Sequence, residues 1–225
     1  MSDNNNAKLN NNHKKSKARN SNYISAKESA RISRENRKIT DALEKQRKRK
    51  NVPESEYLTT MKDPNNVAEF DNLHTYFFTD VGTVKAVDGV TFDIPQGKTV
   101  GVVVGSGRGK SVTALSLMQL VQRPQGQIVE GTIRFNTGDK VYDIAKTPIE
   151  VMEKIRGAKV SMIFQEPMTC LNPVFKVGDQ IDEVIELHNP EMTDEQVKQQ
   201  SLHMIDMVGI ANNTGVYNMY PHELS

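Results

Sequence analysis

The residues best suited to chemistry lie in the segment 101–112, which has the sequence GVVVGSGRGKSV. Small residues allow consecutive backbone N–H groups to surround phosphate oxygens, and the N-terminus of a following helix adds partial positive charge. In a glycine-rich loop that ends in Gly-Lys-Ser, the lysine reaches the terminal phosphates and the serine hydroxyl ligates Mg²⁺. Lys110 and Ser111 are therefore predicted to bind a magnesium-bound polyphosphate.

A glycine-rich turn can also serve only to let a helix pack closely on a strand. Here the Gly-Lys-Ser ending follows an apolar, β-branched run and precedes an amphipathic segment with Ala114, Leu117 and Val121 on one face. A strand, a glycine-rich loop and a helix in this order favour phosphate binding over simple packing.

One position departs from the full pattern GxxxxGK[ST], which requires glycine at 104, where this chain has Val104 and the glycine stands at Gly105. A β-branched residue that must adopt positive φ costs on the order of 1–3 kcal/mol. Because about 1.4 kcal/mol corresponds to a factor of ten, we predict a loss of roughly five- to 200-fold in nucleotide affinity, unless Gly105 and Arg108 compensate.

The elements that must position this loop follow from the spacing of apolar residues and turn residues. Period-two and β-branched runs predict strands, and apolar residues three and four apart predict helices. The strands are expected at 67–78, 84–94, 99–104, 131–136, 141–144 and 159–164, and the helices after Lys110, after Thr147, at 177–188 and at 193–208. Strands and helices in this order indicate an α/β fold.

Composition excludes several classes of protein. The apolar run around residues 102–104 is far below the roughly 18 residues of a membrane-spanning helix. The start MSDNNN has no apolar core of a secretory signal, and a single cysteine, Cys170, excludes a disulfide framework and a cysteine-based zinc site. We expect a reducing, cytoplasmic location.

Charge is divided unevenly along the chain. Residues 1–50 hold 15 Lys and Arg against five Asp and Glu, a net of +10, whereas the whole chain has a net of +1 and the remainder therefore −9. Apolar side chains are sparse before residue 67, which predicts a basic, mostly disordered tail over residues 1–66. Ser25 and Glu28 have the spacing of a capping box, so a short helix is expected within 25–50.

Longer strings carry a resemblance to a known family. The strings AVDGVTFDIPQGKTVGVVV (86–104), GKSVTALSLMQLV (109–121), SMIFQEPMTCLNPVFKVGDQI (161–181) and YPHELS (220–225) resemble the ATP-binding subunits of oligopeptide and dipeptide ABC importers. The resemblance covers about residues 67–225. It implies the N-terminal part of a P-loop NTPase, the ABC-type nucleotide-binding domain, with an antiparallel β-subdomain. An ATP-binding core is expected at 67–166 and a partial helical subdomain at 167–225.

The resemblance also implies roles for individual residues. Gln165 corresponds to the Q-loop glutamine, which contacts Mg²⁺ and the attacking water and couples the nucleotide site to membrane subunits. Alternatively, Gln165 is a polar residue that closes a strand. An aromatic ring at Tyr76 or Phe77 would stack on adenine, or both rings belong to the core of the sheet. The implied ATP-binding residues are Tyr76, Phe77, Gly105, Ser106, Gly107, Arg108, Gly109, Lys110, Ser111 and Val112, with Ser111 and Gln165 on the metal.

The expected function is that of an ATP-binding, energy-coupling subunit of a peptide importer that uses ATP and Mg²⁺. Its implied partners are transmembrane permease subunits and a second ATP-binding subunit, at the cytoplasmic face of the cell membrane. In the family, YPHELS continues into the signature motif, and an acidic strand and a switch histidine follow. The sequence ends at Ser225, so we expect that these residues alone do not hydrolyse ATP at a useful rate.

Two other functions stay open. The chain could be an inert or merely nucleotide-binding fragment, which Val104 favours. It could instead bind nucleic acid through its basic segment, with an affinity that falls steeply with salt. Tyr23 is the only aromatic residue before Tyr57, so the tail has few rings that could stack on bases. An anionic membrane surface is therefore the favoured partner of the tail.

Overall fold

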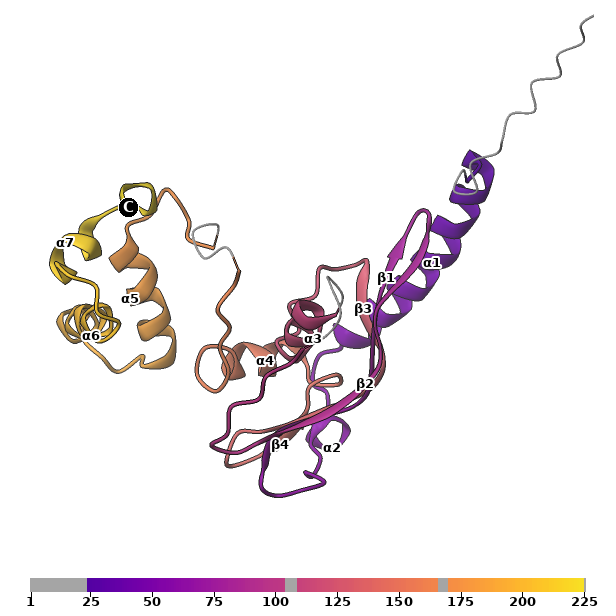
Figure 1. Cartoon of the computed structure of the whole chain (residues 1–225), viewed down its shortest axis with the longest axis horizontal. Helices are drawn as coiled ribbons and strands as arrows, with labels where there is room; N and C mark the ends of the chain where they lie inside the picture. The colour runs from indigo at the N-terminus through magenta and orange to yellow at the C-terminus, as the bar shows by residue number, and fades with distance from the viewer. Residues whose placement is uncertain (1–23, 104–108, 166–169, 225) are drawn as a thin grey trace, which may run out of the picture.

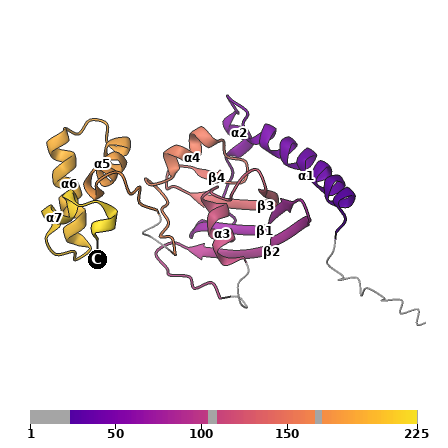
Figure 2. The same cartoon turned by 90° about the horizontal axis from the view of Figure 1, so that it is seen from above.

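The computed structural model describes residues 24–103, 109–165 and 170–224, and its centre is a four-stranded antiparallel sheet in the order β2-β1-β3-β4. The strands are β1 (Asn66–Thr79), β2 (Gly82–Pro95), β3 (Gly126–Asn136) and β4 (Val141–Asp143). Figure 2 shows them side by side. The strands predicted at 67–78, 84–94, 131–136 and 141–144 are therefore confirmed.

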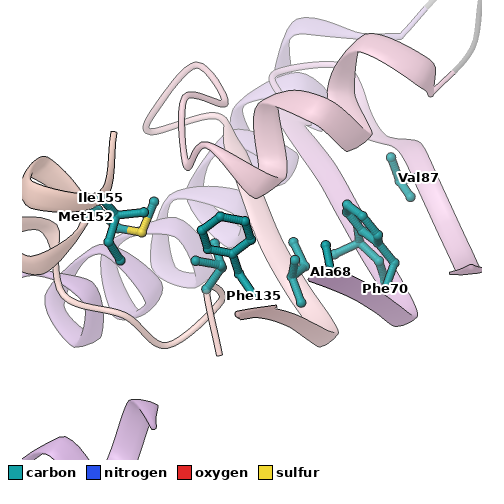
Figure 3. Packing of buried hydrophobic residues seen from close by; sticks show 9 residues of the cluster. Ala68, Phe70, Val87, Phe135, Met152 and Ile155 are labelled. Atoms are coloured by element: carbon teal, nitrogen blue, oxygen red, sulfur yellow. The ribbon is translucent and has the colours of Figure 1, made fainter. Parts of the chain in front are cut away.

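One face of this sheet is covered by α3 (Lys110–Leu117) and α4 (Ile149–Ile155), and the hydrophobic core lies between the sheet and these two helices. Alternation along the strands directs their apolar side chains to this face. The labelled members in Figure 3 include Phe70 of β1, Phe135 of β3 and Met152 of α4. The fully or nearly fully buried members are Ala68, Phe70, Leu73, Val87, Ile133, Phe135, Ile144, Met152 and Ile155.

A β-bulge interrupts the regular pairing in the middle of β1. The register shifts between Phe70 and Leu73, and Asn72 at the bulge has φ 49°. Gly131 of β3 lies opposite with φ 92°, and a Cβ at this position would be 2.3 Å from the carbonyl oxygen of Asn72. Only glycine satisfies both the backbone angle and the close approach.

Residues 24–65 form α1 (Ala26–Arg47), α2 (Glu54–Tyr57) and connecting turns. The predicted cap is present, since the Ser25 side chain accepts a hydrogen bond from the Glu28 amide. α1 runs along the end of the sheet formed by the β1–β2 hairpin (Figure 1). The expected short helix is thus a helix of 22 residues that packs on the sheet. Residues 1–23 lie outside the described residues, so their expected disorder stays a prediction. The division of the chain at residues 66 and 166 also stays a prediction.

The helices α5 (Val177–His188), α6 (Asp194–Met207) and α7 (Asn213–Asn218), with the 3-10 turn η2 (Pro221–Glu223), form a group at the opposite end of the molecule from α1 (Figure 1). A capping box of Thr193 and Gln196 starts α6, the helix expected at 193–208. Asp182 of α5 accepts hydrogen bonds from the hydroxyls of Ser201 on α6 and Tyr217 on α7. One carboxylate therefore links all three helices.

Two predicted strands are not formed. Residues 99–103 are irregular, and Val103 is 92% exposed. Residues 161–164 are also irregular, with Ile163 93% exposed, and only Val160 makes a bridge, to Arg156. An apolar strand of this kind requires neighbouring strands and covered faces, and the described strands belong to a different, antiparallel sheet.

The helix expected after Thr147 begins at Ile149, with Pro148 as its N-cap residue. The Thr147 hydroxyl instead donates to the Asp143 carbonyl.

Among the described helices, none combines the length and the apolar character needed to span a bilayer.

Candidate functional site

The site is built on the first turn of α3, where Gly109 is the N-cap residue in a left-handed conformation with φ 89°. A Cβ at this position would lie 3.0 Å from the carbonyl oxygen of Ala86 on β2. Both the angle and the contact with β2 select glycine. The sequence pattern identified Gly109, but the neighbouring carbonyl of Ala86 carries no sequence signal.

Within the part of the chain that the structure describes, this cap offers no side-chain acceptor to the first amide groups of α3. A glycine supplies no side-chain oxygen, and the helix accordingly has no side-chain cap hydrogen bond. The amide of Thr113 is the first to bond within the helix, to the Gly109 carbonyl at 2.7 Å, so the amides of Lys110, Ser111 and Val112 have no intrahelical partner. Lys110 and Ser111 have exposed side chains, and Val112 is half-buried and packs on the core. This end of the helix can accept an anion.

A buried pair of hydroxyl groups fixes α3 on the sheet. The oxygens of Thr75 on β1 and Ser116 on α3 lie 2.8 Å apart, and both residues are fully buried. Sequence reasoning did not single out these residues. Their signal is a polar residue at a position where the apolar period predicts a core side chain, as at Ser116 between Leu115 and Leu117.

The C-terminal end of α3 is held by groups from α4 and from the β4–α4 connection. Arg156, the C-cap residue of α4, donates from Nε to the carbonyl of Met118 at 2.8 Å and from Nη2 to that of Gln119 at 3.3 Å. The amide nitrogen of the buried Gln119 side chain in turn donates to the carbonyls of Ile144 and Thr147. The helix that begins at Lys110 is thus fixed at its far end by hydrogen bonds and at its centre by Ser116.

The two candidate aromatic residues lie on opposite faces of β1. Tyr76 points away from α3, and its hydroxyl donates to Asp88 at 2.6 Å. The bond to Asp88 raises the pKa of Tyr76, and the bonds from Tyr76 and His74 lower the pKa of Asp88. Phe77 lies on the same face of β1 as Thr75. Its ring is close to Gly126, since a Cβ added to Gly126 would be 2.9 Å from Cε1 of Phe77.

The remaining predicted residues are not all placed. Gly105, Ser106, Gly107 and Arg108, together with Val104, lie outside the described residues. Gln165 is exposed in the irregular segment 161–165, between α4 and α5, and does not end a strand. Among the described residues, no group of three or more His, Cys, Asp or Glu side chains could hold a metal ion. The structure thus brings together Gly109, Lys110, Ser111 and Val112, on the same side of the sheet as Phe77.

The described residues contain the last part of the phosphate-binding pattern of P-loop proteins, which is the sequence Gly-Lys-Ser at the start of a helix. The sequence profile of a family described as "ABC transporter" matches residues 87–225. The chain belongs to this family.

Curated relatives and solved structures agree with this assignment. The chain is 45% identical over 157 residues to "Oligopeptide transport ATP-binding protein AppD" of Bacillus subtilis (strain 168), which covers 70% of this chain and 46% of the relative. It is 41% identical over 159 residues to "Dipeptide transport ATP-binding protein DppD" of the same organism, covering 71% and 46%. It is 44% identical over 160 residues to "Glutathione import ATP-binding protein GsiA" of Pectobacterium atrosepticum, covering 71% and 26%.

The chain therefore spans about half the length, or less, of the curated relatives it matches. Two solved structures share the fold. "Dimeric Structure of MJ0796, a Bacterial ABC Transporter Cassette" and a post-hydrolysis state of the same cassette bound to ADP and Pi each have a TM-score of 0.59 and 19% identity. Each match covers 70% of this chain and 63% of the other. The expected P-loop NTPase fold of the ABC type, present as a partial domain, is confirmed.

Proposed function

We propose that the chain is the ATP-binding, energy-coupling part of a peptide importer. The observation that carries this proposal is the first turn of α3, where a left-handed glycine cap leaves three amides without helix partners beside the exposed Lys110 and Ser111. The names of the relatives AppD and DppD support ATP as the nucleotide and peptides as the solute.

The residues present suit a magnesium-bound triphosphate. The amides at the start of α3 and the ammonium group of Lys110 bind phosphate oxygens, and Ser111 offers a hard hydroxyl oxygen, the type of ligand that Mg²⁺ prefers. Gln165 is the proposed second metal-contacting residue and the proposed contact of the attacking water. Phe77 is the better candidate for stacking on adenine, because Tyr76 faces away from α3 and bonds Asp88. When bound, Mg²⁺ neutralises charge on the phosphates.

Equilibrium binding of fluorescent ATP with and without Mg²⁺ tests this proposal. Lys110→Ala removes charge-assisted bonds worth roughly 1.5–3 kcal/mol, so the affinity is expected to fall by about tenfold or more. Lys154→Ala is a matched control, since Lys154 is an exposed lysine in the last turn of α4. Equal affinities of the wild type and Lys110→Ala would contradict the proposal.

For the partners, we propose permease subunits and a second ATP-binding subunit. An apolar groove of about 900 Å³ lies among α5, α6 and α7 and is lined by residues such as Val184, Met204 and Val208. An exposed apolar groove is typical of a protein–protein contact, and it supports this helix group as the contact for the permeases. The dimeric cassette MJ0796 supports the pairing of two ATP-binding subunits.

We further propose that residues 1–225 alone do not hydrolyse ATP at a useful rate. Measuring the release of phosphate from ATP tests this directly.

We also propose peripheral attachment to the cytoplasmic face of the membrane through α1. Its exposed cations include Lys27, Arg34 and Lys38, which make no ion pair within the described residues. Each basic residue near an anionic surface contributes about 1 kcal/mol. Replacing these three residues with glutamine should reduce sedimentation with phosphatidylserine vesicles. The same change at Lys98, Lys154 and Lys159 is the control.

Binding to duplex DNA, measured over a series of salt concentrations alongside binding to the vesicles, tests the other candidate partner of the basic segment. Retention on DNA but not on vesicles would favour nucleic acid over the membrane.

A further inference from the structure

α1 is joined to the rest of the chain by a partly buried ionic cluster near its C-terminal end. The carboxylate of Glu44 accepts hydrogen bonds from Nη1 of Arg123 at 2.7 Å and from Nε2 of Gln127 at 2.9 Å, and its other oxygen is 3.4 Å from Nη2 of Arg47. The side chains of Glu44, Arg47 and Arg123 are only 13%, 16% and 18% exposed. Because α1 lies outside residues 87–225, the cluster links a segment beyond the family match to one within it.

Two guanidinium groups share the single carboxylate of Glu44. Burial lowers the pKa of Arg123, and the charge of Arg47 lowers it further, whereas the hydrogen bond to Glu44 raises it. The Nε atoms of both arginines are buried and have no hydrogen-bond partner within the described residues. Without the carboxylate, two poorly solvated cations would face each other, so the contact depends on Glu44.

The other half of α1 is fastened to the β1–β2 turn. The Asn36 side chain donates to the Thr79 carbonyl at 2.7 Å, and the Ser29 hydroxyl donates to the Asp80 carbonyl at 2.9 Å. Asn36 and Thr40 are the buried residues of this helix, and both are polar. α1 is therefore held mainly by specific hydrogen bonds, which single substitutions can remove.

Arg123 lies a short distance along the chain from α3. Between Leu117, the last residue of α3, and Arg123, both Met118 and Val121 are buried, and Arg156 holds the carbonyls of Met118 and Gln119. The segment has little freedom to absorb a movement of Arg123. A displacement there would reach the end of α3, and α3 is a helix of only eight residues, about 12 Å long.

We propose that α1 is a clamp on α3, in which Glu44 holds Arg123 and thereby fixes the segment that leaves the helix carrying Lys110 and Ser111. Glu44 is then a positioning residue for a site that it does not touch. The effect on nucleotide affinity rests on the proposed function, whereas the effect on α3 does not.

Amide hydrogen exchange of the nucleotide-free chain tests the clamp directly. In Glu44→Gln, the amides of α1 and of α3 are expected to exchange about tenfold faster than in the wild type, because both helices open more often. Glu35→Gln is the matched control, since it removes an exposed carboxylate from the same helix. If Glu44→Gln does not fold, Glu44→Asp keeps the charge but shortens the side chain, and it should give smaller changes in the same direction.

Affinity for Mg-ATP is the second measurement. Glu44→Gln is expected to weaken binding by about three- to tenfold, and Glu35→Gln to leave it unchanged. The exchanged pair Glu44→Arg with Arg123→Glu should restore most of both the exchange rates and the affinity, since it re-forms the ion pair. Rescue of this kind separates the pairing itself from general damage to either residue.

If the amides of α1 exchange faster but those of α3 are unchanged, the clamp is overturned, and α1 packs on the sheet without affecting α3. Unchanged exchange in both helices would also overturn it. If exchange in α3 rises but the wild type binds no ATP, the clamp stands and the proposed function fails.

Discussion

The hydroxyl of Thr75 on β1 donates a hydrogen bond to the hydroxyl oxygen of Ser116 on α3, across a distance of 2.8 Å in the fully buried contact between sheet and helix. The direction follows from the second bond of Ser116, whose only hydroxyl proton is used on the Val112 carbonyl at 2.7 Å. The pair ties the sheet to the helix that carries the proposed phosphate site.

This direction predicts unequal effects of two substitutions. Ser116→Ala leaves the buried Thr75 donor without an acceptor and should cost about 1–3 kcal/mol of the free energy of unfolding, whereas Thr75→Val should cost about 1 kcal/mol. The double variant should be less destabilised than the sum of the two. Urea unfolding of the three variants measures this, and equal single costs with full additivity would contradict the assigned direction.

Gly109→Ala is expected to reduce both stability and nucleotide affinity. The added Cβ meets φ 89° and the Ala86 carbonyl at 3.0 Å, and the left-handed conformation alone costs about 1–2 kcal/mol. Gly138→Ala is the control, because Gly138 has φ 97° and no heavy atom within 4 Å of the added Cβ. Both variants should be destabilised, but only Gly109→Ala should bind ATP at least tenfold more weakly. Equal affinities would exclude a role of this cap in binding.

The ionic cluster at Glu44 predicts a dependence of stability on acid pH. Burial raises the pKa of Glu44, but bonds from Gln127 and Arg123 and the charges of Arg123 and Arg47 outweigh it and lower the pKa from 4.5 to about 2. Because the pKa is lower in the folded state, the stabilisation is complete above pH 4.5 and is lost as pH falls towards 2.

Glu44→Gln should therefore remove on the order of 3 kcal/mol at pH 7 and almost nothing at pH 2, measured as the difference in free energy of unfolding from the wild type. A difference between the two proteins that does not change with pH would contradict the lowered pKa.

The phenol of Tyr217 is expected to ionise at a higher pH than an unperturbed tyrosine. Burial and the bond to Asp182 raise its pKa from 10 to about 12. Its contribution to stability is then present below pH 10 and is lost as pH rises from 10 to 12. Absorbance of tyrosinate near 295 nm should show a late step from Tyr217 in the titration of the six tyrosines, together with loss of helix signal. Tyr217→Phe should remove this step, and Tyr220→Phe, at an exposed residue, should keep it.

Val104→Gly restores the glycine of the full phosphate-loop pattern. Because a valine that must adopt positive φ costs roughly 1–3 kcal/mol, we expect this change to tighten ATP binding by about five- to 200-fold, unless Gly105 and Arg108 compensate. Titration of the nucleotide against both proteins measures the change. Equal affinities would show that a valine is tolerated at this position of the loop.

Much of the fold was predictable where the pattern is local. Residues 177–188 were expected as a helix and form α5, because apolar residues recur at helical spacing before Asn189 and Pro190. The two long strands β1 and β2 were expected at 67–78 and 84–94, because period-two and β-branched runs occur there. At the site, Gly109, Lys110 and Ser111 were identified because a phosphate loop imposes residue types at fixed spacing.

The contacts between distant segments could not be predicted. Glu44 is one of few acidic residues in a basic segment, and its partner Arg123 is 79 positions away, so composition alone indicated a tail. Tyr76 and Phe77 could not be separated, because the face of β1 that each occupies depends on where α3 packs. The runs at 99–104 and 159–164 have strand composition, but strand formation also requires partners in space.

The uncovered aliphatic side chains of Val103 and Ile163 have a consequence for anyone who purifies these residues. Each stands in an apolar run that pairs with no strand of the described sheet, and such a run is a template for strand addition between molecules. We expect the isolated polypeptide to self-associate at high concentration, and a lysine at either position to keep it dispersed.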